Sequence, residues 1–137
     1  MILTVRTERK RECIEITDSV RDLVRKSGVT RGLCHVMALH ATAAIAINEN
    51  DDPNIGLDLL DALEKLAPEG AGWRHDRIDG NAHAHIQAAV MGPQEIVPVE
   101  EGDLLLGRWQ GILLVELDGP RAERRISVQV VPVDSAR

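Results

Sequence analysis

Residues 33–48 of the chain read Leu-Cys-His-Val-Met-Ala-Leu-His-Ala-Thr-Ala-Ala-Ile-Ala-Ile-Asn. Two apolar runs, 33–39 and 43–48, flank the triplet His40-Ala41-Thr42, a pattern that predicts two largely buried strands. Asp51-Asp52-Pro53 follows and predicts a helix start, because a carboxylate can cap free amides and proline fits the first turn. This stretch therefore predicts both sheet and helix within one short segment.

The flanking sequence continues the same mixture. Residues 2–8 and 12–16 are β-rich and are split by a charged turn, which predicts a hairpin. We expect helices over about 18–26, capped by Thr17, over 53–66, and from a cap at Asn81 to Gly92. Further strands are expected over 94–99, 104–110, 111–117 and 125–133. Strands and helices do not alternate strictly, so we expect one α+β domain over 1–137 with packed, largely antiparallel, sandwich-like sheets and two to three short helices.

Composition excludes several classes of protein. The 137 residues include 22 acidic and 16 basic side chains, for a net charge of -6, and the only aromatics are two tryptophans. The acidic balance argues against a nucleic-acid partner, which needs a basic surface. No apolar run reaches the ~18 residues of a membrane helix. Two cysteines, Cys13 and Cys34, are too few for a disulfide framework, and the N-terminus lacks a secretion-signal pattern, so we expect a cytoplasmic protein without a membrane partner.

Four of the five histidines lie in or beside irregular segments: His40, His75, His83 and His85. Residues two apart on a helix point about 200° from each other, so we expect His85 to face inward and His83 to lie on the periphery. His40, His75 and His85 could share a metal, because three neutral imidazoles and an open position form a common catalytic zinc arrangement. Their spacing matches no compact metal motif, and the alternative is that they are scattered structural histidines.

A second polar group is Asn48-Glu49-Asn50-Asp51-Asp52, where a strand gives way to a helix. Carboxylates and amides at such a junction can hold Mg²⁺ or position a polar substrate. The same residue types also cap helices and build turns, so a purely structural role is the alternative.

A third segment is Leu106-Gly107-Arg108-Trp109-Gln110-Gly111. Two glycines bracketing Arg-Trp-Gln predict a bulge or a close backbone approach, and arginine is well shaped for phosphate. A tight turn with a packing tryptophan is the alternative. Arg121, Arg124 and Arg125 follow an Asp-Gly-Pro turn and are expected at a solvated hairpin tip.

Taken together, these motifs resemble the YjbQ-like family, whose members are described as secondary thiamine-phosphate synthases. The resemblance spans nearly the whole chain, with the motifs in the expected order. They are His40-Ala41-Thr42-Ala43-Ala44-Ile45-x-Ile47-Asn48-Glu49-Asn50, Asp52-Pro53, Trp73-Arg74-His75-Asp76, Asn81-Ala82-x-Ala84-His85-Ile86 and Gly107-x-Trp109-Gln110-Gly111-Ile112.

The resemblance implies a small α+β fold that assembles as a homotrimer, with a histidine site near subunit contacts. It implies a divalent metal, Zn or Mg, at His40, His75 and His85. The residues expected to carry catalysis are Glu49, Asn48 and His40. The residues expected to bind a phosphate-bearing substrate are Arg74, Asn81, Arg108, Trp109 and Gln110.

The leading functional hypothesis is a transferase of the thiamine-phosphate synthase type, with a weak or secondary activity. It would join hydroxymethylpyrimidine diphosphate to a thiazole phosphate and release pyrophosphate, which needs a divalent cation and cationic groups around the leaving diphosphate. One alternative is a metal-dependent hydrolase or lyase with Glu49 as general base. Another is a non-catalytic trimeric module that binds a metal or an anion.

Overall fold

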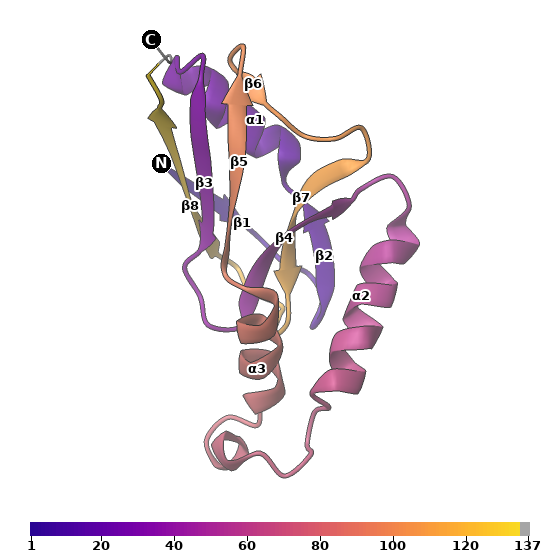
Figure 1. Cartoon of the computed structure of the whole chain (residues 1–137). Helices are drawn as coiled ribbons and strands as arrows, with labels where there is room; N and C mark the ends of the chain where they lie inside the picture. Colours follow the sequence, from indigo (N-terminus) through magenta and orange to yellow (C-terminus); the bar gives the residue numbers. More distant parts are fainter. Residues whose placement is uncertain (135–137) are drawn as a thin grey trace.

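The computed structural model, which describes residues 1–134, contains two antiparallel sheets packed face to face, with two helices covering the smaller sheet (Figure 1). This confirms the α+β, sandwich-like prediction. The elements are, in order, β1 (Ile2–Val5), β2 (Glu12–Glu15), α1 (Thr17–Ser27), β3 (Gly32–Ala38), β4 (Ala43–Glu49), α2 (Pro53–Leu66), the 3-10 turn η1 (Arg74–Arg77), α3 (Ala82–Met91), β5 (Gln94–Glu100), β6 (Asp103–Leu104), β7 (Gln110–Glu116) and β8 (Arg124–Pro132).

The larger sheet has the strand order β1-β8-β3-β5-β6, and the smaller has the order β2-β7-β4. The two expected buried strands therefore lie in different sheets: β3 is the centre of the larger one and β4 an edge of the smaller one. The turn 39–42 carries the chain from one sheet to the other. His40 consequently lies at one end of the sandwich, between the layers.

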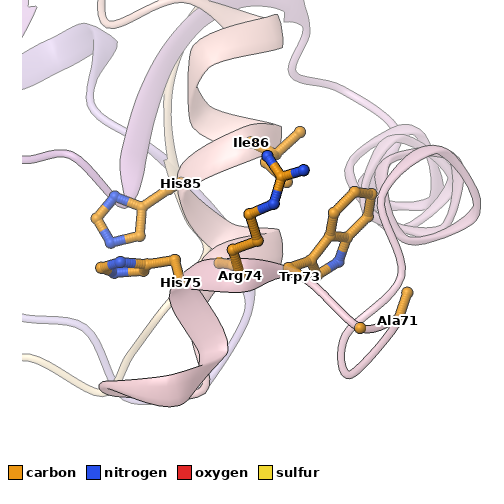
Figure 2. Close-up of a pocket in the computed structure, with 8 residues that line it drawn as sticks. Ala71, Trp73, Arg74, His75, His85 and Ile86 are labelled. Atoms are coloured by element: carbon orange, nitrogen blue, oxygen red, sulfur yellow. The ribbon is translucent and has the colours of Figure 1, made fainter.

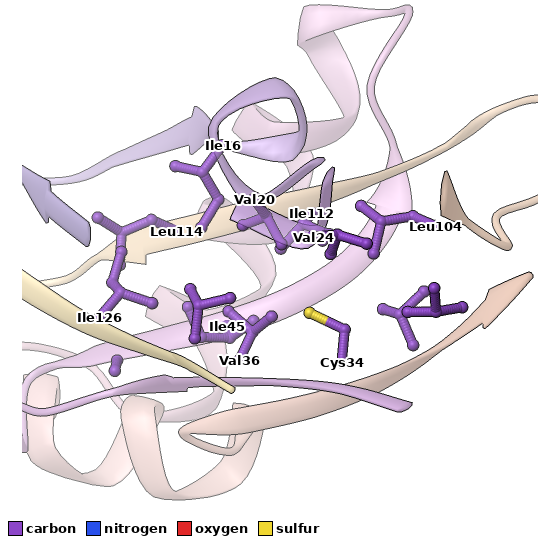
Figure 3. Packing of buried hydrophobic residues seen from close by; sticks show 14 of the residues in the cluster. Ile16, Val20, Val24, Cys34, Val36, Ile45, Leu104, Ile112, Leu114 and Ile126 are labelled. Carbon is purple, nitrogen blue, oxygen red and sulfur yellow. The ribbon is translucent and has the colours of Figure 1, made fainter. Parts of the chain in front are cut away.

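The main core fills the space between the sheets, and α1 closes one end of it (Figure 3). Alternate residues of β3, Cys34 and Val36, face this core together with Ile45 of β4. A second cluster lies on the other side of the smaller sheet, where Leu60 and Leu63 of α2 pack toward Ala84 and Ala88 of α3. The smaller sheet is thus buried on both faces, which agrees with its almost continuous apolar sequence.

The start of α2 confirms the prediction made from Asp51-Asp52-Pro53. The Asp52 side chain accepts a hydrogen bond from the Asn54 amide at 2.9 Å, and Pro53 occupies the first turn. Gly56, one turn further on, lets the helix approach β2 closely, because a Cβ there would lie 3.1 Å from the Cβ of Cys13. An added Cβ at this position would require Cys13 or α2 to shift by a few tenths of an ångström.

The other two predicted caps differ from the prediction: Ile16, not Thr17, precedes α1, and Asn81 holds the N-cap position of α3 without a side-chain capping bond. Thr17 lies inside α1 and its hydroxyl accepts the Ile112 amide of β7 at 2.9 Å, so it joins the helix to the sheet. Asn81 precedes α3 but makes no capping bond with its side chain. Asp76 of η1 accepts the Ala82 amide instead, at 3.0 Å. Thr17 thus makes a long-range contact in place of a local cap, and α3 is capped by Asp76 from the preceding loop.

Two strand predictions also need correction. Residues 2–8 and 12–16 do not form a hairpin, because β1 pairs with β8 and β2 pairs with β7, in different sheets. Residues 104–110 do not form one strand: β6 ends at Leu104 and β7 begins at Gln110. Between them the chain turns at 107–110, where the Gln110 side chain accepts the Gly107 amide at 2.7 Å.

A buried ion pair connects the two sheets at the His40 end of the sandwich. Glu116 of β7 is fully buried and Arg124 of β8 is 3% exposed, and the guanidinium Nε lies 3.0 Å from each carboxylate oxygen. Thr7 donates to the same carboxylate at 2.7 Å, and Arg124 also donates to the carbonyl and hydroxyl of Thr42. Arg124 is therefore not at a solvated hairpin tip as predicted, because its partner Glu116 holds it in the interior.

We expect Arg124→Ala to lower the free energy of unfolding by about 3–5 kcal/mol, because it leaves the buried Glu116 carboxylate without its cation. Urea unfolding followed by circular dichroism measures the loss. The neighbouring Arg125→Ala, on the same strand but exposed, is the matched control and should change stability by no more than about 0.5 kcal/mol. A similar small effect for both variants would contradict the structural role given to the pair.

Candidate functional site

The loop between α2 and α3 carries the Trp-Arg-His-Asp motif and is fixed at several points. Gln87 of α3 donates to the carbonyl of Ala67 at 3.0 Å, which holds the end of α2 against α3. The Trp73 indole donates to the carbonyl of Pro68 at 2.8 Å, so the loop closes on itself. Together with the bond from the Ala82 amide to Asp76, these contacts place η1 beside the first turns of α3.

A cavity of about 720 Å³ lies between this loop and α3, and we call it the histidine cleft (Figure 2). It is lined by Ala71, Gly72, Trp73, Arg74, His75, Ala82, His85 and Ile86. The rings of His75 and His85 meet edge to face, with centroids 4.8 Å apart and planes at 84°. In Figure 2 the Arg74 side chain lies between this pair and Trp73. Two imidazoles, one guanidinium and one indole thus line one concave surface.

A second cavity of about 610 Å³, which we call the apolar cavity, lies between α3 and the turn that joins β3 to β4. His85 lines both cavities and His40 lines only the second. The structure therefore brings together His75 and His85 directly, and places His40 on the far wall of a cavity that His85 also borders. All three histidines selected from the sequence belong to this region.

His40 is held in one tautomer by the backbone of β8. Its Nε2 accepts a hydrogen bond from the Arg125 amide at 2.7 Å, so the proton of the neutral ring lies on Nδ1. Burial lowers the pKa of His40 below its ordinary value, and the nearby charges of Arg124, Arg121 and Arg125 lower it further, against an opposing effect of Glu116. His40 is therefore a neutral N–H donor at pH 7, with its lone pair already engaged.

His83 and His85 lie on different sides of α3, as the helical geometry predicts, but the expected exposures are reversed. His83 is 1% exposed, whereas His85 is partly exposed in the histidine cleft. The prediction assumed a single inward stripe, but α3 packs against both β4 and α2. The side of α3 that faces α2 therefore buries His83 and Gln87, and a carboxylate oxygen of Glu69 lies 3.9 Å from the His83 Nε2.

Asn81 lies at the start of α3 but does not line the histidine cleft. Its Nδ2 donates to the carboxylate of Asp118 at 3.0 Å, which ties α3 to the turn after β7. The side chain therefore joins two elements, and the substrate-binding role expected for it stays a prediction.

The remaining predicted site residues lie at the opposite end of β4. Asn48 and Glu49 end this strand, and Glu49 pairs in register with Gln110 of β7. Seven residues of strand rising ~3.3 Å each place Glu49 about 20 Å from the His40 end. Arg108 lies over the ring of Trp109 at 4.9 Å, and that indole is 51% exposed. Within one chain these residues do not reach the histidine cleft.

Local hydrogen bonds occupy most of the polar groups at this second end. Asp52 caps α2, Asn50 donates to Glu15 at 2.7 Å, and Asn48 accepts the Glu49 amide at 2.7 Å. A small cavity of about 170 Å³ lies beside them, lined in part by Glu15 and Glu49. These contacts give Asp52, Asn50 and Asn48 capping and turn-building roles. Such structural roles were the alternative to cation or substrate binding in the sequence analysis.

The whole-chain comparison decides the family. A model of the UPF0047 YjbQ-like proteins matches residues 1–133. The chain belongs to this family. The UPF0047 protein of Archaeoglobus fulgidus is 45% identical over 126 residues, which is 92% of this chain and 97% of that one. Bacillus subtilis YugU is 38% identical, covering 87% and 89% of the two chains.

Solved structures agree with the YjbQ-like assignment. A YbjQ-like protein of unknown function from Sulfolobus solfataricus superimposes with a TM-score of 0.93 at 41% identity, covering 97% of this chain and 96% of that one. An uncharacterized family protein from Clostridium acetobutylicum gives 0.91 at 40% identity, covering 96% and 99%. The resemblance inferred from the motifs is therefore confirmed, together with the fold that it implied.

The metal prediction can be compared with the side chains present. Across residues 1–134, no group of three or more His, Cys, Asp or Glu side chains is arranged to hold a metal ion. His75 and His85 are close enough to act as two ligands of one ion, and their imidazoles suit zinc and other first-row metals. The remaining ligands would come from water, substrate or a second copy of this YjbQ-like chain.

Sequence reasoning missed the residues that shape the apolar cavity. They are Met37, Ala38, Leu39, Ala41, Ala43, Ala88, Ala89 and Pro93. Alone, each looks like an ordinary strand, turn or helix residue. The available signal was the number of alanines beside His40 and His85, because small side chains around a polar group leave space next to it.

Proposed function

We propose that the histidine cleft binds a phosphate-bearing small molecule, and that the chain is an enzyme of the thiamine-phosphate synthase type. The observation that carries the proposal is the position of Arg74 beside the His75–His85 pair in one cavity. A guanidinium matches phosphate oxygens in shape and charge, and imidazoles exchange protons near neutral pH. The cleft also has the size of ordinary small-molecule sites.

In the proposed reaction the bond between the pyrimidine methylene carbon and the diphosphate oxygen breaks. A bond forms from that carbon to the thiazole nitrogen, and pyrophosphate leaves with the electron pair of the broken bond. Negative charge grows on the leaving group, so a fixed cation beside it lowers the barrier. In this proposal Arg74 supplies that charge, and His75 or His85 delivers a proton to the departing oxygen.

The 20 Å between the ends of β4 limits what a single chain can do. Glu49 and Asn48, the residues expected to be catalytic, cannot act on a molecule in the histidine cleft of their own chain. They take part only if another copy brings its Asn48–Glu49 end to this cleft, so their role depends on the assembly proposed below.

We expect Arg74→Ala to weaken binding of inorganic phosphate, and to slow synthesis of thiamine phosphate, by at least about tenfold, because a charge-assisted hydrogen bond is lost. Isothermal titration calorimetry and a product assay by mass spectrometry measure the two effects. Arg77→Ala, also in η1 but outside the cleft, is the control and should retain both properties. Unchanged binding and turnover in both Arg74→Ala and His85→Ala would refute the proposed site.

The pair of imidazoles favours a second candidate, a metal-dependent hydrolase or lyase. His75 and His85 would hold the ion, which would supply a Lewis acid in the cleft. His40 fits this ligand set poorly, because its Nε2 lone pair already accepts the Arg125 amide. The third candidate, a non-catalytic metal- or anion-binding module, differs from both in binding without turnover.

If the metal proposal holds, the purified protein carries about one Zn²⁺ or other divalent ion per chain, and both His75→Ala and His85→Ala lose it. Inductively coupled plasma mass spectrometry measures the content. Arg77→Ala is the matched control, since Arg77 lies in the same 3-10 turn as His75 but does not line the cleft. A metal-free wild-type protein, or one whose content is unchanged by both cleft variants, would exclude the proposed ligands.

We further propose that the chain is a homotrimer. The outer face of the larger sheet carries apolar side chains that are about half exposed, among them Leu33, Ile96 and Val131. Leu33 is the register partner of Val131, and His35 that of Ile96, so they form one patch. Exposed apolar patches on a sheet commonly mark an interface.

In solution the wild-type mass by light scattering should therefore approach three times the chain mass of 15.0 kDa. Ile96→Asp should shift the mass toward one chain, because a carboxylate in an apolar interface is costly. Leu57→Asp, on an equally exposed position of α2, should leave the assembly intact. A wild-type monomer at micromolar concentration would contradict the trimer.

A cytoplasmic location is also a proposal. Burial raises the pKa of the Cys13 and Cys34 thiols to about 11, so both stay protonated, and neither forms a disulfide. Free thiols are the usual state in a reducing compartment. Across residues 1–134, no helix has both the length and the apolar character needed to cross a bilayer.

A further inference from the structure

We infer that the apolar cavity holds the uncharged body of the same small molecule whose phosphate binds in the histidine cleft. This inference rests on the proposed function and adds the class of substrate. It is carried by a single fact of geometry, namely that His85 lines both cavities. A ligand anchored by its phosphate near Arg74 therefore has a second cavity adjoining the first, on the other side of one side chain.

The lining of the second cavity determines which kind of group fits it. Apart from His40 and His85, every lining residue is apolar, including Met37, Leu39, Ala41, Ala88, Ala89 and Pro93. No Asp, Glu, Lys or Arg side chain lines it, so it offers no partner to a second charge. Its volume of about 610 Å³ is within the range of small-molecule sites. The body is therefore neutral and as large as an aromatic ring or more.

His40 gives this cavity one directional group. Because its Nε2 accepts the Arg125 amide, its Nδ1 carries the ring proton and is the nitrogen free to donate. A hydrogen-bond acceptor on the ligand body would satisfy this donor. The substrate class is thus a phosphate ester whose neutral, ring-sized body carries an acceptor atom.

Two features favour a small molecule over a protein segment as the occupant. The cavity adjoins the histidine cleft at His85, and the cleft contains the cationic group and the His75–His85 pair. Its walls also bear small side chains, Ala41, Ala88 and Ala89, which leave depth for a compact group. The occupant is then fixed at one end by charge and at the other by burial of apolar surface.

The test compares two probes of equal charge, methyl phosphate and 2-phenylethyl phosphate, by isothermal titration calorimetry on the full chain. We expect the phenylethyl ester to bind at least about tenfold more tightly, because it buries a ring that the methyl ester lacks. Ala89→Leu narrows the apolar cavity from an exposed helical position and should abolish this difference while leaving methyl phosphate binding unchanged. Ala62→Leu makes the same change on α2, outside both cavities, and should preserve the difference.

Each other outcome overturns the inference in a recognisable way. If methyl phosphate binds and the phenylethyl ester binds no better, the apolar cavity is not part of the site, although the proposed phosphate site stands. If the advantage persists in Ala89→Leu, the ring binds elsewhere. If Ala89→Leu changes the mass in light scattering, the cavity is a contact between copies. If neither ester binds, the phosphate site itself fails, and the inference fails with it.

Discussion

The arrangement of the whole molecule depends on the buried ion pair between Glu116 and Arg124. A carboxylate and a guanidinium in the interior are tolerated only when each is fully paired, and here the carboxylate receives Thr7 and Arg124 while the guanidinium also binds Thr42. Because the partners belong to different sheets, the pair fixes how the sheets meet. Arg125, the next residue, then presents its amide to His40. Two successive residues of β8 therefore anchor the interior network and His40.

The site itself depends on a different constraint, the closure of the loop between α2 and α3. Gln87 binds the carbonyl of Ala67, and Trp73 binds that of Pro68. Lys10 reaches the same loop from the other side, contacts Glu69 at 2.6 Å, and lowers the pKa of that carboxyl. The 3-10 turn that carries Arg74 and His75 is thereby held beside α3 within an otherwise irregular loop. Such a loop holds reactive side chains on the rigid scaffold formed by the helices and sheets.

Features set by neighbouring residues could be predicted from the sequence, and those set by distant partners could not. The start of α2 was predicted correctly because the Asp52 cap and Pro53 act within one turn. The predicted hairpin over 2–16 was wrong because its two strands pair with strands near the other end of the chain. β1 pairs with β8, and β2 pairs with β7. Arg124 was expected in solvent although Glu116 lies only eight residues before it, because the sequence does not show that β7 and β8 join different sheets and bury the pair between them. Likewise the motifs identified His75 and His85, but their contact needed the loop closure, and the apolar cavity had no motif.

The length of β4 affects how the sequence of such a protein can evolve. The strand is paired with β7 along its whole length and is therefore rigid. It keeps the Asn48–Glu49 end at a fixed distance from the histidine end. Substitutions around α3 can therefore alter ligand preference without disturbing the other end, and the reverse also holds. Selection can act on the two ends separately while the scaffold stays the same. A new ligand specificity could arise in such a chain through side chains alone, with no change of fold.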